Sequence, residues 1–354
     1  AVEVIKYGLK VVPAYAIEAG VRFLVLIMTI KWLPNYTTVV AVFALASGVA
    51  TITSISFTLT PAISESYNNG YKNLTQYYIR SQWFHWALIG SFLFTCIYIL
   101  LPPAFRLLAG NYAFAADILP ILLITRLIVF PINFGSSVAQ GINKPEYQTY
   151  ALFFEQTTRA FCYYAFLNPS WGLITVVGAE YSLILYSLAD FPAFLVKLFT
   201  QWLFVKRTIK FSVAPPMWKT FGATILSQIP VALLLLIPVT AFKRIAATSE
   251  SVVIPVVILG VTLMVALFLF PLFVLFPCFG LFGGWDEDSL RAFEDAAKIS
   301  GPSRFLVKVM AKTTRWGHEH SPIKNKYQLD FSKAKPEAEK LSAIRIRKYL
   351  LEKK

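Results

Sequence analysis

Residues 252–276 read VVIPVVILGVTLMVALFLFPLFVLF, a run of 25 residues without an acidic or basic side chain. A helix needs ~20 mostly apolar residues to cross the hydrocarbon core of a bilayer, so the run predicts a membrane-spanning helix. Seven further segments share this character, and their continuous apolar runs differ from the strict alternation of β-barrel strands. The eight predicted spans cover residues 8–30, 37–62, 83–101, 117–140, 147–167, 172–204, 218–240 and 252–276.

The composition of the 354-residue chain agrees with these spans. Hydrophobic residues make up 56% of it and charged residues 15%, whereas soluble domains carry about 25% charged residues. This balance excludes a disordered chain, a disulfide scaffold and an ordinary soluble enzyme. Because most connections between the spans are short, we expect a single all-α polytopic bundle over residues 1–277. Residues 278–354 are more polar and basic, which predicts a partly helical cytoplasmic tail.

The net charge of +14 comes from lysines and arginines that collect between the spans and in the tail. Cytoplasmic loops of membrane proteins are rich in Lys and Arg, and anionic lipid is a better partner for such a chain than nucleic acid. The bias places both termini in the cytoplasm of a multi-pass protein of the cell (plasma) membrane. Residues 336–354 alternate apolar and basic side chains, which predicts a helix on an anionic membrane surface.

Two Glu-x-x-x-Arg pairs lie inside predicted spans. Glu18 and Arg22 are four residues apart in the first span, and Glu155 and Arg159 repeat this spacing in the fifth. Residues four apart share one helix face, so each pair can neutralise itself. Two interpretations stay open for such residues, because intramembrane charges either pair structurally or line a water-filled path. In the second case the arginines would attract an anionic substrate.

Further ionisable residues lie deep in the later spans. Arg126 has no acidic residue at helical spacing in the fourth span, and the sixth span holds Glu180 and Asp190. These acids could offer counter-charges or proton sites in a cavity. Lys197, near the end of its predicted span, is expected to extend its ammonium group to the membrane surface.

Two prolines inside spans are candidate hinges. Pro131 and Pro192 each remove a backbone donor and bend a helix, and bent or broken helices are common in transporters. No catalytic motif accompanies them: the sequence has no GxSxG, HExxH or P-loop pattern. The three cysteines have no metal-ligand spacing. We therefore expect neither an enzyme nor a metal or cofactor site.

Several short motifs resemble those of the polysaccharide flippases, which belong to the multidrug/oligosaccharidyl-lipid/polysaccharide exporter superfamily. They follow the order and spacing of the second half of such proteins. The matching stretches are residues 6–9 (KYGL), 61–66 (PAISES), 69–72 (NGYK), 139–145 (AQGINKP), 172–179 (GLITVVGA) and 286–290 (DEDSL).

The resemblance implies flipping of a polyprenyl-(di)phosphate-linked oligosaccharide by alternating access. Family members have two lobes and about twelve to fourteen helices, so this chain would need an N-terminal lobe or a second copy as partner. Arginine suits forked contacts with phosphate, and acids could couple transport to protons or sodium. The candidate substrate-binding residues are Arg22, Arg126 and Arg159. The candidate ion-coupling residues are Glu18, Glu155, Glu180 and Asp190.

Two alternatives stay open beside the flippase. A drug or cation antiporter of the same superfamily would favour acids over arginines in its cavity. A membrane scaffold that recruits glycan-assembly enzymes would use the ion pairs structurally and would have no cavity. A membrane glycosyltransferase is disfavoured, because no acidic metal-binding cluster lies at a predicted membrane boundary.

Overall fold

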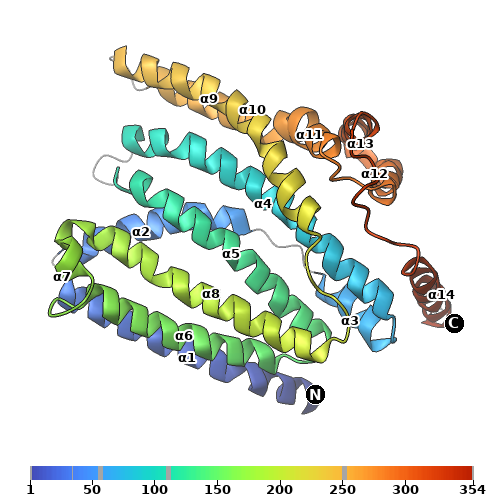
Figure 1. Cartoon of the computed structure of the whole chain (residues 1–354), viewed down its shortest axis with the longest axis horizontal. Coiled ribbons are helices and arrows are strands. Elements are labelled where there is room, and N and C mark those ends of the chain that lie inside the picture. Colours follow the sequence, from blue (N-terminus) through green and yellow to red (C-terminus); the bar gives the residue numbers. More distant parts are fainter. Residues whose placement is uncertain (1, 34, 55–58, 109–112, 249–252, 353–354) are drawn as a thin grey trace. The chain divides into compact units, whose positions relative to one another are not determined.

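The computed structural model describes residues 2–33, 35–54, 59–108, 113–248 and 253–352 (Figure 1). Within these ranges every regular element is helical and no strand occurs. This confirms the all-α class and, with the apolar helices below, a polytopic membrane protein. The helices of the described residues that are long and apolar enough to cross a membrane are Val12–Trp32, Lys72–Arg106, Ala115–Gly141, Ala179–Thr208, Trp218–Thr248 and Val253–Leu281.

The helices group into two compact units, one formed by residues 1–65 and 105–212 and the other by residues 66–104 and 213–354. This grouping differs from the predicted division after residue 277, because the tail packs with the second unit. The first unit contains α1 (Val2–Trp32), α2 (Tyr36–Ala50), η1 (Thr51–Ser54), α5 (Ala115–Gly141), α6 (Glu146–Leu167), α7 (Ile174–Val177), η3 (Ala179–Tyr181) and α8 (Ser182–Thr208). The second unit contains most of α4 (Lys72–Leu108) and the apolar elements η4 (Trp218–Ala223), α9 (Thr224–Thr248), α10 (Val253–Phe270), η5 (Pro271–Leu275) and α11 (Phe276–Leu281). It also contains the tail elements α12 (Glu287–Ile299), η6 (Gly301–Ser303), α13 (Arg304–Glu319) and α14 (Lys335–Glu352). The short helix α3 (Thr60–Asn68) has residues in both units.

Two of the eight predicted spans have no counterpart among the six apolar helices of the described residues given above. The helix observed in the predicted span 37–62 is shorter than predicted, because α2 ends at Ala50. Residues 55–58 lie outside the described part of the chain. Pro61 stands in the first turn of α3, where proline is tolerated. The Ser/Thr-rich sequence after Ala50 explains the early end, since hydroxyl groups compete for backbone hydrogen bonds: the Thr51 hydroxyl donates to the Ser47 carbonyl at 2.7 Å. The predicted span 147–167 forms α6, which is long enough to cross a bilayer but more polar than the six helices above.

Close packing of α5 against α8 gives the first unit its centre. A Cβ atom built on Gly135 would lie 3.3 Å from the side chains of Gln201 and Trp202, so glycine lets the two helices approach. The Trp202 indole N–H donates to the Pro131 carbonyl at 3.0 Å. In the same unit α6 packs against α1 and α8, and α5 packs against α2 (Figure 1). These contacts hold the inner faces of five helices around one interior.

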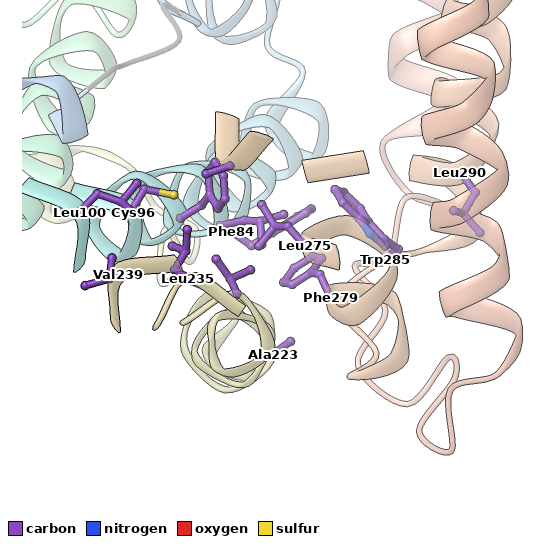
Figure 2. Packing of buried hydrophobic residues seen from close by; sticks show 14 of the residues in the cluster. Phe84, Cys96, Leu100, Ala223, Leu235, Val239, Leu275, Phe279, Trp285 and Leu290 are labelled. Carbon is purple, nitrogen blue, oxygen red and sulfur yellow. The ribbon is translucent and has the colours of Figure 1, made fainter. Parts of the chain in front are cut away.

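The core of the second unit joins membrane helices to the start of the tail (Figure 2). Phe84 of α4, Phe279 of α11 and Trp285 belong to one buried cluster, in which the last two rings meet edge to face at 4.9 Å. The Trp285 indole N–H also donates to the Phe276 carbonyl at 3.0 Å. Buried aromatic pairs of this kind bring a large apolar area and a fixed geometry. The residues after 277 are therefore a folded extension of this core.

Within the described residues the tail forms α12, α13 and α14, and α14 covers most of the range 336–354 that the sequence predicts to be helical. α13 crosses α11 at very short range: a Cβ on Gly317 would lie 2.1 Å from the Pro277 carbonyl oxygen, so only glycine fits there. α14 contacts the first turn of α4, where the Glu337 carboxylate accepts hydrogen bonds from the Leu74 N–H at 2.7 Å and the Asn73 amide at 2.8 Å. Carboxylates at a helix N-terminus satisfy free N–H groups and the helix dipole.

His318 lies in the crossing of α11 and α13. Its side chain is fully buried, and within the described part of the chain neither ring nitrogen has a well-aligned hydrogen bond. Burial lowers the pKa of His318, with Lys324 acting in the same direction and the carboxylates of Glu287 and Asp286 opposing it. The folded state therefore binds fewer protons than the unfolded state once the pH falls below the ordinary histidine pKa of about 6.5.

We expect acid to destabilise the docking of α13 for this reason. As the pH falls through about 6.5, unfolded chains gain a proton on His318 that folded chains exclude, so the thermal midpoint of unfolding falls. Unfolding followed by circular dichroism at several pH values measures this. The variant His318→Leu should flatten that part of the pH profile, whereas His320→Leu, at an exposed histidine two residues away, should leave it unchanged. Equal profiles for the wild type and His318→Leu would contradict the assignment.

Candidate functional site

A polar pocket of about 370 Å³ lies inside the first unit. Helices α1, α2, α5, α6 and α8 all contribute to its wall. The three arginines predicted to bind substrate line it together, although they come from three helices far apart in the sequence. The charged residues of the wall are Arg22, Arg126, Arg159 and Asp190, and its aromatic residues are Phe43, Tyr163, Tyr186 and Phe194.

The charged wall residues stand near the middles of their helices. Arg22 is midway along the span Val12–Trp32, and Arg126 is close to the centre of the span Ala115–Gly141. Arg159 likewise lies near the centre of α6. Substrate sites of secondary transporters typically lie near the bilayer midplane, and intramembrane charges mark such paths. The charged residues of the wall thus lie far from the ends of these apolar helices.

Two buried and two partly buried charged side chains form a neutral network. Arg159 donates through Nη2 to Glu155 Oε1 at 2.7 Å and through Nε to Asp190 Oδ1 at 2.8 Å. The Lys197 ammonium nitrogen lies 2.6 Å from Glu155 Oε2. Two cations and two carboxylates cancel, which keeps the desolvation cost of these buried groups tolerable. The network joins α6 to α8 on one side of the pocket.

Arg126 is the cation that this network leaves unbalanced. It donates through Nη2 to the Ser47 hydroxyl of α2, and among the described residues it forms no ion pair. Arg159 also keeps a free donor, since its buried Nη1 has no hydrogen-bond partner in the described part of the chain. Arg22 is paired with Glu18 at 2.6 Å. Counted together with their partners Glu18, Glu155 and Lys197, the charged wall residues carry one net positive charge, and Arg159 keeps an unused guanidinium donor.

Aromatic rings shape the rest of the pocket. The Arg159 guanidinium carbon lies 5.3 Å from the centre of the Phe194 ring, within the range of cation–π attraction. Tyr163 and Tyr186 meet edge to face, with their ring centres 5.1 Å apart. These rings limit how far the guanidinium can move. The Arg159 guanidinium is thus held by two carboxylates and one aromatic ring.

The remaining predicted site residues fall outside the wall. Glu18 and Glu155 contact it only through their arginine partners. Glu180 is exposed in η3, because Gly178 has a φ of +106° and breaks the helix before α8 begins. Pro131 and Pro192 stand inside α5 and α8, as the sequence suggests. Of the acids predicted to couple ions, the pocket itself contains Asp190.

Sequence reasoning missed two polar contacts. Lys197 points inward to Glu155 rather than to the membrane surface. The sequence held one signal for this: Lys197 is seven residues from Asp190, and residues two helical turns apart share a helix face. Lys197 could therefore be expected on the same face of its helix as Asp190. In the second unit, Lys219 is fully buried and forms an ion pair with Asp286, and no spacing within one helix could have indicated this. Among the described residues, no group of three or more His, Cys, Asp or Glu side chains is placed to hold a metal ion.

Comparisons with protein-family models, with curated proteins and with solved structures find no match for the chain. The chemistry of the pocket is therefore the basis for assigning a function.

Proposed function

We propose that the protein binds the diphosphate group of a polyprenyl-linked oligosaccharide in the arginine pocket and flips this lipid across the cell membrane. The convergence of Arg22, Arg126 and Arg159 in a pocket with an unbalanced cation carries the proposal. A diphosphate is anionic and accepts forked hydrogen bonds, which arginine supplies better than lysine. The polyprenyl chain would stay in lipid beside apolar helices.

A diphosphate bound to Arg126 and to Nη1 of Arg159 would compete with Asp190 for the Arg159 guanidinium, because both are acceptors for its N–H groups. A proton on Asp190 would weaken the hydrogen bond that Asp190 accepts from Nε of Arg159. This gives Asp190 a coupling role in the proposed cycle, while Glu155 keeps Lys197 as its partner. A second lobe, from another copy or another chain, would supply the opposite wall, and both termini would face the cytoplasm.

The test is binding of a labelled polyprenyl-diphosphate oligosaccharide by the full chain in nanodiscs, followed by flipping in proteoliposomes. We expect Arg126→Gln to weaken binding by about 10- to 100-fold, because a charge-assisted hydrogen bond contributes about 1.5–3 kcal/mol. Arg126→Lys should retain part of the affinity. The matched control is Arg106→Gln, which removes an exposed arginine paired with Asp117 at 3.1 Å.

Two results would contradict the proposal. One is equal affinity of the wild type for the diphosphate-linked sugar and for a neutral lipid-linked sugar. The other is unchanged binding by Arg126→Gln under conditions where the wild type binds. Loss of binding by Arg106→Gln as well would show that the effect of the Arg126 change is not local.

The neutral network around Arg159 favours a second candidate, a membrane scaffold. Arg159 is almost fully buried and already holds two carboxylates, as expected of a structural ion cluster. In a scaffold the pocket would bind no lipid-linked sugar, so the same binding measurement separates the two functions.

A further inference from the structure

Helices α12 and α13 form a hairpin with an exposed apolar tip. Ile299 is 87% exposed at the end of α12, and Phe305 and Leu306 are 73% and 53% exposed at the start of α13. Isolated exposed apolar residues are ordinary, but three large ones at one turn form a patch. Such a patch usually marks a protein or membrane contact.

Basic side chains accompany this tip. Between residues 296 and 318 the sequence has five Lys or Arg residues and no Asp or Glu. Arg304, Lys308 and Lys312 follow one another at a spacing of four, so they form a stripe along α13. Among the described residues none of these three forms an ion pair, whereas Lys298 is paired with Asp295. The stripe lines a hollow of about 440 Å³ between the two helices.

The hairpin is fixed beside the end of the last apolar span. α13 packs against α11 and η5, which complete the span Val253–Leu281. Gly317 and His318 of α13 make this contact, where they lie against Pro277 and Gly280 of α11. The side chains of the basic stripe and of the apolar tip are exposed, so they remain accessible beside this contact. The end of a membrane-spanning helix is where lipid headgroups lie.

We propose that the α12–α13 hairpin is a binding site for anionic phospholipid at the surface of the membrane that holds the protein. Ile299, Phe305 and Leu306 insert among the headgroups and upper acyl chains, and Arg304, Lys308 and Lys312 bind lipid phosphates. Interfacial helices combine these two features, with an apolar face in the lipid and cations beside it. Each cation near an anionic surface raises binding about fivefold. Free inorganic phosphate would match the cations but leave the apolar tip in water.

The test places a fluorescent label at the tip of the full chain in nanodiscs. Phe305→Cys carries the label in a background in which Cys96, Cys162 and Cys278 are alanine, and Leu306→Cys is an independent second position. The control label is at Asp288→Cys, an exposed position of α12 that lies eleven residues, or about 16 Å along the helix, from Ile299. The measurement is quenching by nitroxide-labelled lipids, in neutral discs and in discs containing phosphatidylglycerol.

We expect strong quenching at both tip positions in anionic discs and little at Asp288. Quenching at the tip should fall severalfold in neutral discs, in about 1 M salt, and in the variant Arg304→Gln/Lys308→Gln/Lys312→Gln. The matched control is Lys206→Gln/Arg207→Gln/Lys210→Gln, which removes the same three charges from exposed positions outside the hairpin and should leave quenching unchanged.

Three outcomes would overturn the proposal. Tip labels quenched no more than the Asp288 label would show that the hairpin lies in water. Tip quenching that is the same in neutral and anionic discs, or in the triple variant, would show that the cations bind no headgroup. Quenching of the tip labels that weakens as the number of chains in each disc rises would show that a second copy covers the tip.

Discussion

Replacing Arg159 by methionine is expected to lower the free energy of unfolding by about 3–5 kcal/mol, the usual cost of removing one partner from a buried ion pair. Glu155 and Asp190 would then have Lys197 as the only cation of the network. The side chains of Glu155 and Arg159 are 3% and 7% exposed, so water cannot replace the lost guanidinium. The two carboxylates would repel each other, which loosens α6 from α8.

The thermal midpoint of unfolding in detergent micelles, followed by circular dichroism, measures this loss. The double variant Arg159→Met/Asp190→Asn should be more stable than Arg159→Met alone, because it leaves Glu155 and Lys197 as a neutral pair. Arg106→Met serves as control: it breaks an exposed pair with Asp117, and such pairs contribute about 0–1 kcal/mol. If Arg159→Met has the same thermal midpoint of unfolding as Arg106→Met, the network does not stabilise the fold.

The second large effect is expected at the Lys219–Asp286 pair of the second unit. Changing Asp286 to asparagine leaves the fully buried Lys219 ammonium without its carboxylate, at a cost of about 3–5 kcal/mol. The ring of Phe84, 5.2 Å from the ammonium nitrogen, compensates for only a small part of this. Asp286 directly precedes α12, so the damage should spread to the hairpin.

Limited proteolysis of the hairpin and the thermal midpoint together measure this second effect. We expect Asp286→Asn to expose the region of α12 and α13 to protease. The double variant Lys219→Met/Asp286→Asn should recover part of the midpoint, since an apolar replacement of a buried pair is often neutral. Asp295→Asn, which breaks the exposed pair with Lys298, is the control and should change neither measurement. Additive losses in the double variant would mean that the two charges do not interact.

The sequence predicts local features of this protein better than contacts between helices. Long apolar runs gave the helical class and six of the spans, and the spacing of Glu155 and Arg159 gave a pair that the structure confirms at 2.7 Å. The contact between Arg159 and Asp190 spans 31 residues and depends on how α6 meets α8, which no periodicity encodes. Glu180 was placed too deep because hydropathy does not register that a glycine with positive φ ends the helix.

The carboxylate of Glu337 that caps α4 has a consequence for the order of events during synthesis. It bonds to Asn73 and Leu74, residues made about 264 positions earlier. At about 5–20 residues per second, a ribosome needs roughly 13–50 s to cover that distance. Throughout this interval the N–H groups of the first turn of α4 lack the carboxylate that caps them in the folded protein. The fold of the second unit is therefore completed only after α14 has been made.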